Sequence, residues 1–141
     1  MGADRVILYK EEDFVEAAKS AGGADVILDM VAGDYFERNI QALAPKGRLV
    51  QIATLHGAEV KLDIRKVMAK NLTITGSMLR PRPVAEKARI AAELEENIWP
   101  LLNAGKMKPL IYKILPLEKA SEAHAMMEAS QHTGKIVLKI R

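Results

Sequence analysis

The sequence contains no cysteine. This absence excludes a disulfide-stapled scaffold, a thiolate zinc site, an iron–sulfur cluster and a cysteine nucleophile. It is also typical of proteins that work in a reducing compartment, so we expect a cytoplasmic location. The single tryptophan, Trp99, falls in a helical pattern and is expected to serve packing.

Long apolar runs and a strong charge of one sign are also missing. No run approaches the roughly 18 apolar residues of a membrane helix, and the charged N-terminus lacks the apolar core of a signal peptide. The chain carries 21 Lys and Arg against 18 Asp and Glu, a net charge of +3. Because the basic residues are scattered, we expect no nucleic-acid surface. With 141 residues, 49% of them hydrophobic, the chain has the size and balance of one globular domain.

Several motifs that carry chemistry are absent. Neither G-x-G-x-x-G nor G-x-x-x-x-G-K-[ST] occurs, so the usual phosphate cradle at a helix N-terminus is missing. There is no G-x-S-x-G nucleophile elbow. The three histidines, His56, His124 and His132, never share i,i+4 spacing on one helix, so we expect solvated or packing roles and no metal site.

Apolar, β-branched runs alternate with helical stretches in the first half of the chain. Strands are predicted at VILY (6–9), DVILDM (25–30), RLVQIA (48–53) and LTITG (72–76). The first two runs are almost continuously apolar, which is typical of parallel strands buried on both faces. Helices are predicted over 11–21, over 34–43 and from an Asp63 cap to Met68, with Gly22-Gly23 as a stop and Pro45-Lys46-Gly47 as a turn. The alternation favours βαβ units.

The pattern changes after the loop at residues 80–83. A long helix is predicted over 84–102, with Pro100 expected to kink it or end it early. A strand at 108–115, a helix at 118–130 and a strand at 135–140 complete the chain. The fold class is therefore α/β, with a C-terminal strand-helix-strand segment.

Ligands of open parallel sheets bind beyond the carboxyl ends of the strands. At those ends, Ala53 and Gly76 leave room for a flat ring, and Thr54 and Ser77 offer hydroxyl groups. The alternative is that these are ordinary turns. Asp29 ends an apolar strand, where its carboxylate could bind a ribose or could cap the following turn.

Six phrases in a fixed order carry a resemblance to a known family. They are GADRVI (2–7), GADVILDMV (23–31), GRLVQIA (47–53), LTITGSMLR (72–80), PLEKASEAH (116–124) and GKIVL (134–138). The order is similar to the C-terminal part of a medium-chain dehydrogenase/reductase, in the zinc-free quinone oxidoreductase branch that includes zeta-crystallin. Ala32 and Met78 depart from that pattern, since the branch usually has glycine and Thr or Leu there.

The resemblance implies a partial Rossmann-type parallel sheet, strands 3 to 6 of the order 3-2-1-4-5-6. It implies NADPH as the cofactor and hydride transfer to a quinone or another activated alkene. The residues it places at the cofactor are Tyr9, Gly33, Ile52, Ala53, Thr54, Leu55, Ser77, Met78, Leu79 and Arg80. No catalytic acid can be assigned.

The resemblance also implies how the chain is divided and which parts of the full enzyme it lacks. Residues 1–106 would form the C-terminal portion of the NAD(P)-binding domain, and residues 107–141 a return segment that docks on a GroES-like catalytic domain. The chain lacks strands 1 and 2 and their glycine-rich turn, so we expect it to be inactive alone. Strand 6–9 would pair with strand 25–30, pair with another chain or remain loose.

Unpaired strand edges favour association, so we expect a homo-oligomer, with strand 72–76 as a second contact. Two other functions stay open: a non-catalytic self-association module, and an enoyl-thioester reductase relative.

Overall fold

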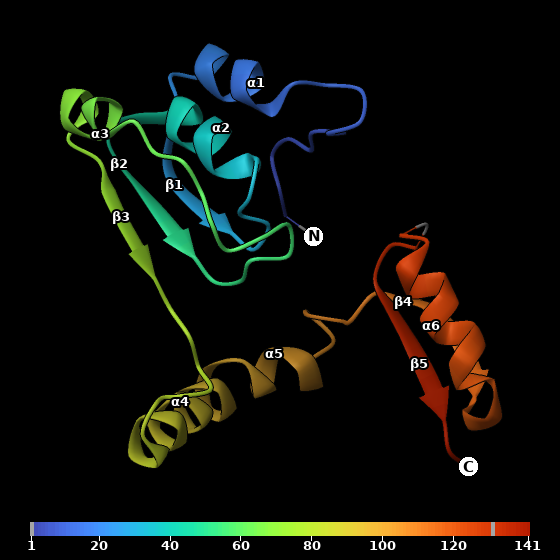
Figure 1. Ribbon diagram of the computed structural model, residues 1–141. Helices are drawn as coiled ribbons and strands as arrows, with labels where there is room; N and C mark the ends of the chain where they lie inside the picture. Colours follow the sequence, from blue (N-terminus) through green and yellow to red (C-terminus); the bar gives the residue numbers. More distant parts are fainter. Residues whose placement is uncertain (1, 131) are drawn as a thin grey trace. The chain divides into compact units, whose positions relative to one another are not determined.

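The computed structural model describes residues 2–130 and 132–141. These residues form two compact units, Met1–Arg82 and Pro83–Arg141, which Figure 1 draws in blue to green and in yellow to red. The predicted boundary at residue 106 depends on docking to another domain and stays a prediction.

The first unit is built on a three-stranded parallel sheet in the order β1-β2-β3. Its strands are β1 (Ala24–Asp29), β2 (Leu43–Gln51) and β3 (Thr73–Gly76). All three lie where the apolar runs predicted them, so the α/β class and the parallel sheet are confirmed. Ile27 pairs with Leu49, and Leu49 pairs with Ile74, which sets the register across the sheet.

Three helices connect and cover these strands: α1 (Phe14–Ser20), α2 (Tyr35–Ala42) and α3 (Ile64–Lys70). Aspartates cap two of them, because the Asp13 carboxylate accepts from Val15 N at 2.7 Å and the Asp63 carboxylate from Arg65 N at 3.0 Å. The Asp63 cap was predicted. The Lys70 ammonium donates to three backbone carbonyl groups at the end of α2, including Leu43 O at 2.6 Å. These bonds tie α3 to α2.

The hydrophobic core lies between the sheet and these helices. Phe36 and Ile40 of α2 pack with Leu43 and Leu49 of β2. Leu49 and Ile40 are completely buried, and burying such a side chain contributes about 1.5–3 kcal/mol. Ile27, Leu62 and Leu72 border the cluster. The core therefore occupies one face of the sheet.

The prediction that β1 is buried on both faces is wrong. Successive residues of a strand point to opposite faces, and Val26 is 62% and Leu28 is 65% exposed. Among the described residues of this unit, the helices cover only the face that carries Ile27. The opposite face of β1 is open.

The prediction of a strand at Val6–Tyr9 is also wrong, so three of the four expected strands of this sheet are present. Leu8 O instead accepts from Glu11 N at 2.7 Å and Glu12 N at 2.8 Å, which closes a turn. Strand structure requires a neighbouring ladder, and β1 pairs only with β2 within the described residues.

The predicted turn at Pro45-Lys46-Gly47 lies inside β2. It forms an irregularity there, because the pairing register shifts between Ala24 and Val26 on the facing strand. Lys46 has a φ of +64°, a left-handed conformation that L-residues rarely adopt.

The second unit begins with α4 (Val84–Asn97) and α5 (Trp99–Asn103). Pro100 sits in the first turn of α5, so the predicted long helix is interrupted just before the proline, as expected. The chain continues through β4 (Ile111–Pro116), a 3-10 turn (Leu117–Lys119), α6 (Ala120–Glu128) and β5 (Lys135–Lys139). β4 and β5 pair in parallel and confirm the strand-helix-strand segment.

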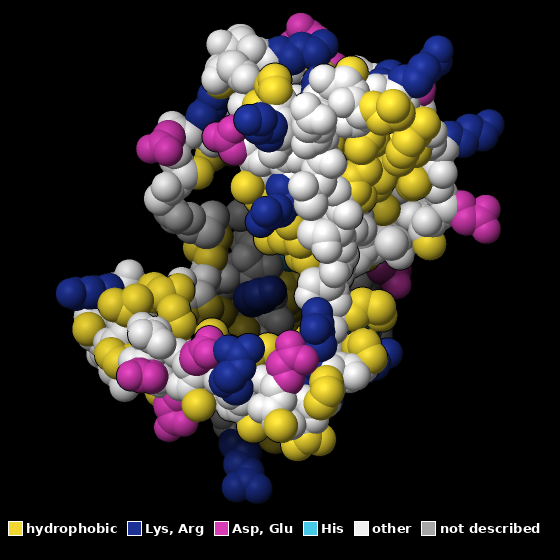
Figure 2. All heavy atoms as spheres, turned by 90° about the vertical axis from the view of Figure 1, so that its left-hand side faces the viewer, with side chains coloured by type: hydrophobic (Ala, Val, Ile, Leu, Met, Phe, Trp, Pro, Cys, Tyr) yellow, Lys and Arg dark blue, Asp and Glu magenta, His cyan; other side chains and the backbone are white. Residues whose placement is uncertain are grey.

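Many apolar side chains remain on the surface of both units. Met68 of α3 and Val84 of α4 are mostly exposed, and Figure 2 shows hydrophobic side chains in yellow among the charged ones on one side of the molecule. Exposed apolar surface of this extent marks contact sites. No helix in the described part of the chain is both long and apolar enough to cross a membrane.

Candidate functional site

The carboxyl ends of the three parallel strands lie at one edge of the sheet. Two backbone bonds continue the ladders beyond the strands: Ile52 N donates to Asp29 O at 2.8 Å, and Ser77 N donates to Gln51 O at 3.0 Å. The segments that follow β1, β2 and β3 therefore start side by side. This is the edge at which open parallel sheets bind ligands.

The loops after β1 and β2 are joined by further backbone bonds. Leu55 N donates to Met30 O at 3.1 Å, His56 N to Val31 O at 2.8 Å, and Gly33 N to Gly57 O at 3.2 Å. A Cβ on Gly33, whose φ is +51°, would lie 2.3 Å from His56 O. Gly33 is thus required for the close approach of the two loops, and its contact with a cofactor stays a prediction.

Asp29 organises the turn at the end of β1. The side chain is buried, and its Oδ1 accepts from Val31 N at 2.7 Å. Its Oδ2 accepts from Ala32 N and from Asn39 Nδ2, both at 3.0 Å. The sequence left two roles open for Asp29, and in the structure its carboxylate caps the turn that follows β1.

Gln51 is a polar residue of this edge that the sequence analysis missed. Its Nε2 donates to Ala53 O at 2.6 Å and to Asp29 O at 3.1 Å. Its Oε1 is buried and accepts no hydrogen bond from the described residues. A buried acceptor without a partner is costly, so this oxygen is suited to a donor on a ligand. A polar side chain within the apolar RLVQIA run was the available signal.

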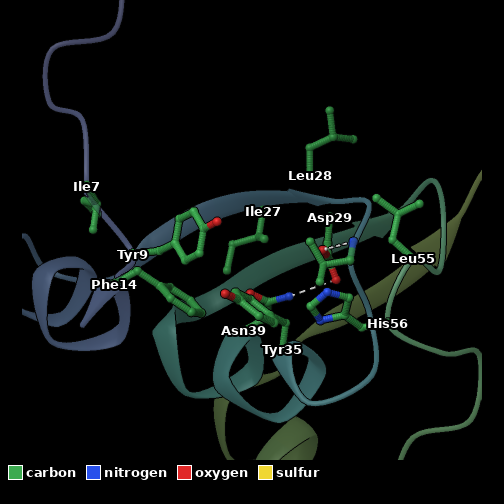
Figure 3. Close-up of a pocket in the computed structure, with 11 residues that line it drawn as sticks. Ile7, Tyr9, Phe14, Ile27, Leu28, Asp29, Tyr35, Asn39, Leu55 and His56 are labelled. Atoms are coloured by element: carbon green, nitrogen blue, oxygen red, sulfur yellow. Dashed lines mark hydrogen bonds between the residues drawn. The ribbon is translucent and has the colours of Figure 1, made fainter. Parts of the chain in front are cut away.

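A cavity of about 410 Å³ lies beside β1 in the same unit. Figure 3 shows it between the N-terminal segment, β1, α2 and the loop after β2. Of the ten predicted cofactor residues, it brings together Tyr9 and Leu55. The full lining is Ile7, Tyr9, Phe14, Ile27, Leu28, Asp29, Val31, Tyr35, Asn39, Leu55 and His56.

Aromatic rings form one wall of this cavity. The rings of Phe14 and Tyr35 stack with centroids 5.7 Å apart and planes 3° from parallel, and His56 meets Tyr35 edge-on at 6.0 Å. The Arg38 guanidinium lies 4.4 Å above the Phe14 ring. No local spacing in the sequence reveals this group, because its members come from α1, α2 and a loop.

The other eight predicted residues do not line the cavity. Ile52, Ala53 and Thr54 follow β2, and Ser77 begins the segment after β3. Most of the ten are exposed; Ala53 and Gly33 are half-buried. Met78, Leu79 and Arg80 lie in the exposed segment after Ser77, where Arg82 Nε donates to Met78 O at 3.2 Å. Contact of these residues with a cofactor stays a prediction.

The histidines occupy separate places. His56 belongs to the aromatic wall, His124 lies on α6, and His132 packs near Tyr112 with ring centroids 6.0 Å apart. Among the described residues no group of three or more His, Asp or Glu side chains could hold a metal ion. The zinc-free character of the family branch remains a prediction.

Residues 1–138 match a family model described as zinc-binding dehydrogenase. Quinone oxidoreductase from Mus musculus is 32% identical over 143 residues, covering 97% of this chain and 41% of that protein. The chain therefore spans about two fifths of the length of the curated relatives it matches.

Solved structures agree with this assignment. An NAD-dependent alcohol dehydrogenase superposes with a TM-score of 0.77 at 31% identity, over 99% of this chain and 39% of that one. A mycobacterial protein in complex with NADPH gives a TM-score of 0.76 at 25% identity, over 99% of this chain and 43% of that one. The chain belongs to the zinc-binding dehydrogenase family and corresponds to the C-terminal part of a medium-chain dehydrogenase/reductase.

Proposed function

We propose that these residues form the cofactor-facing part of an NADPH-dependent reductase that acts on a quinone or another activated alkene. The observation that carries the proposal is the shared edge at the ends of β1, β2 and β3, where Ile52 and Ser77 follow neighbouring strands. When bound, the cofactor would supply a hydride to the electron-poor carbon of the acceptor.

The residues of this edge fit part of a dinucleotide. Ala53 and Gly76 have almost no side chain, so a flat ring can approach the backbone between them. The unpartnered Gln51 Oε1 can accept a hydrogen bond from an amide or hydroxyl group, and the Thr54 and Ser77 hydroxyl groups can donate. The protein's task would be to hold and orient the ring.

The pyrophosphate has no corresponding cradle in these 141 residues, because the sequence contains no G-x-G-x-x-G turn. We therefore expect the chain alone to bind NADPH weakly and to be inactive. The quinone oxidoreductase and NADPH-bound relatives support the choice of acceptor and cofactor.

A calorimetric titration with NADPH, and with NADH in parallel, tests the proposal. We expect saturable binding with a Kd on the order of 1 mM, about −4 kcal/mol. Ala53→Phe should abolish this binding by filling the space beside Gln51. Ala85→Phe adds the same ring on exposed α4 and should leave it unchanged. Binding that survives Ala53→Phe, or no heat at all, would contradict the proposal.

We also place the protein in the cytoplasm, because it has no cysteine, and expect it to form a homo-oligomer through exposed strand edges. β1 and β3 lie at the two edges of the sheet, and such edges pair with other chains. Neither a nucleic acid nor a membrane is an expected partner.

A further inference from the structure

The hydrogen-bond ladder between β1 and β2 breaks at the carboxyl edge of the sheet. Ile52 N still donates to the last carbonyl of β1 at 2.8 Å, and in a regular parallel ladder Val31 O would next accept from Thr54 N. Val31 O accepts instead from His56 N at 2.8 Å. The chain after β2 therefore holds two extra residues at this point, and Ala53 is the first residue of the break.

Two side chains bind the backbone groups at this break. The Asp29 carboxylate, whose bond to Asn39 is drawn in Figure 3, also accepts from Val31 N at 2.7 Å. The Gln51 amide binds carbonyl groups: its Nε2 donates to Ala53 O at 2.6 Å and to Asp29 O at 3.1 Å. Asp29 thus holds the chain that follows β1, and Gln51 holds the chain that follows β2.

The contacts of Gln51 leave one of its own atoms unsatisfied. In the described part of the chain, only Gln51 Oε1 and His132 Nδ1 are buried side-chain atoms without a hydrogen-bond partner, and burying an unpaired acceptor is destabilising. The amide cannot turn over, because Oε1 would then meet the carbonyl oxygen of Ala53. An apolar side chain would avoid this penalty, and such departures from favourable packing are expected at functional positions.

Ala53 depends on Gln51 for its place in the loop. The ladder fixes Ile52 before it, and the bond from Leu55 N to Met30 O, at 3.1 Å, fixes the chain after it. Between these bonds, the Gln51 side chain makes the only hydrogen bond that reaches Ala53 from the described residues. Loss of this bond would let Ala53 move with the loop.

We propose that Gln51 is a positioning residue of the cofactor site, which fixes the Ala53 backbone at the break and so sets the surface on which the nicotinamide ring lies. The inference rests on the proposed function, in which Ala53 and Gly76 leave room for that ring. A small displacement of the residues that support a reacting ring weakens its binding and orientation. This role acts through Ala53 and is separate from any contact of Oε1 with the ligand.

Replacement of Gln51 by methionine tests this role, because methionine has a similar length but donates no hydrogen bond. NMR titration compares NADPH with its 3-acetylpyridine analogue, in which a methyl ketone replaces the carboxamide. The analogue isolates the positioning role, since it cannot donate to Oε1. We expect Gln51→Met to weaken the binding of the analogue about fivefold, as for one lost hydrogen bond, and that of NADPH by at least as much.

The control makes the same substitution away from the site. Gln41→Met, at an exposed position of α2, should bind both ligands like the wild-type chain. An analogue that binds Gln51→Met as tightly as the wild type would overturn the positioning role alone. A wild-type chain that binds neither ligand would overturn the proposed function and this inference with it.

Two further measurements separate positioning from a structural role. Gln51→Met removes the unpaired acceptor along with two hydrogen bonds, so we expect its unfolding temperature to stay within about 2 °C of the wild type. In the wild-type chain, the side-chain amide protons of Gln51 should exchange about tenfold slower than those of Gln41. A fall in unfolding temperature as large as that of the core variant Leu49→Ala, or equally fast exchange of the two amides, would overturn the inference.

Discussion

Lys46 holds a backbone conformation that its side chain does not favour. Its φ is +64°, and the exposed side chain lies in the irregular part of β2, where the register shifts. A left-handed conformation costs an L-residue about 1–2 kcal/mol relative to glycine. The neighbouring Gly47 is buried, and a Cβ there would lie 2.8 Å from Ala44 O. The local fold therefore requires glycine at position 47 and would accept it at position 46.

Replacing Lys46 with glycine should stabilise the chain. We expect Lys46→Gly to raise the free energy of unfolding by about 0.5–1 kcal/mol, because relief of the steric strain exceeds the added entropy of the unfolded chain. Lys46→Ala removes the same charge but keeps the Cβ, so it should bring no gain. Urea unfolding followed by circular dichroism compares the two variants. Equal stability of the two would show that the strain is absent.

At the scale of elements, α2 and α3 are joined by a charged contact as well as by the Lys70 hydrogen bonds. The Lys66 ammonium of α3 donates to the Glu37 carboxylate of α2. This hydrogen bond is the largest cause that lowers the pKa of Glu37 below its ordinary value of 4.5, against the opposing effect of burial. Both side chains are more than a third exposed, so the contact is screened by water.

The α2–α3 contact should add an acid-sensitive part to the stability. A carboxylate whose pKa is lowered on folding stabilises fully above 4.5, and this stabilisation is lost as the pH falls through the folded value. Glu37→Gln should therefore make the decline of stability below pH 4.5 shallower. At pH 7 we expect a coupling of at most about 1 kcal/mol in a double-mutant cycle with Lys66→Gln. Additive single variants would exclude the coupling.

The sequence predicted elements wherever the signal was local. β1, β2 and β3 were found because each contains a short apolar, β-branched run, and α3 because Asp63 stands before its first turn. Val6–Tyr9 shares the Val-Ile-Leu run of β1 but forms no strand, because strand structure depends on a partner that composition does not reveal.

The candidate site, too, was predicted only where the signal was local. Tyr9 and Leu55 were predicted and line the cavity, and the Asp29 cap was one of two roles considered. Phe14, Tyr35 and His56 meet only through tertiary packing, which a single sequence does not encode in any local spacing.

At the scale of the molecule, the open edge of β3 is the surface at which we expect self-association. Ser77 N donates to Gln51 O, and amides alternate between the two sides of a strand, so Gly76 N points away from β2. β3 is only four residues long, and all four are exposed. We expect a second copy to extend the sheet at this edge.

Gly76→Pro should therefore dissociate the oligomer. Light scattering of the wild-type chain should give at least twice the 15.5 kDa of one copy. Proline removes the edge amide and should reduce the mass to that of one chain. Gly76→Ala keeps the amide, and its Cβ would lie 3.4 Å from Gln51 O, an ordinary contact, so this variant should stay oligomeric. A monomeric wild-type chain would contradict self-association altogether. Equal masses for the two variants would place the contact elsewhere than β3, because the two substitutions differ chiefly in the edge amide on which the pairing depends.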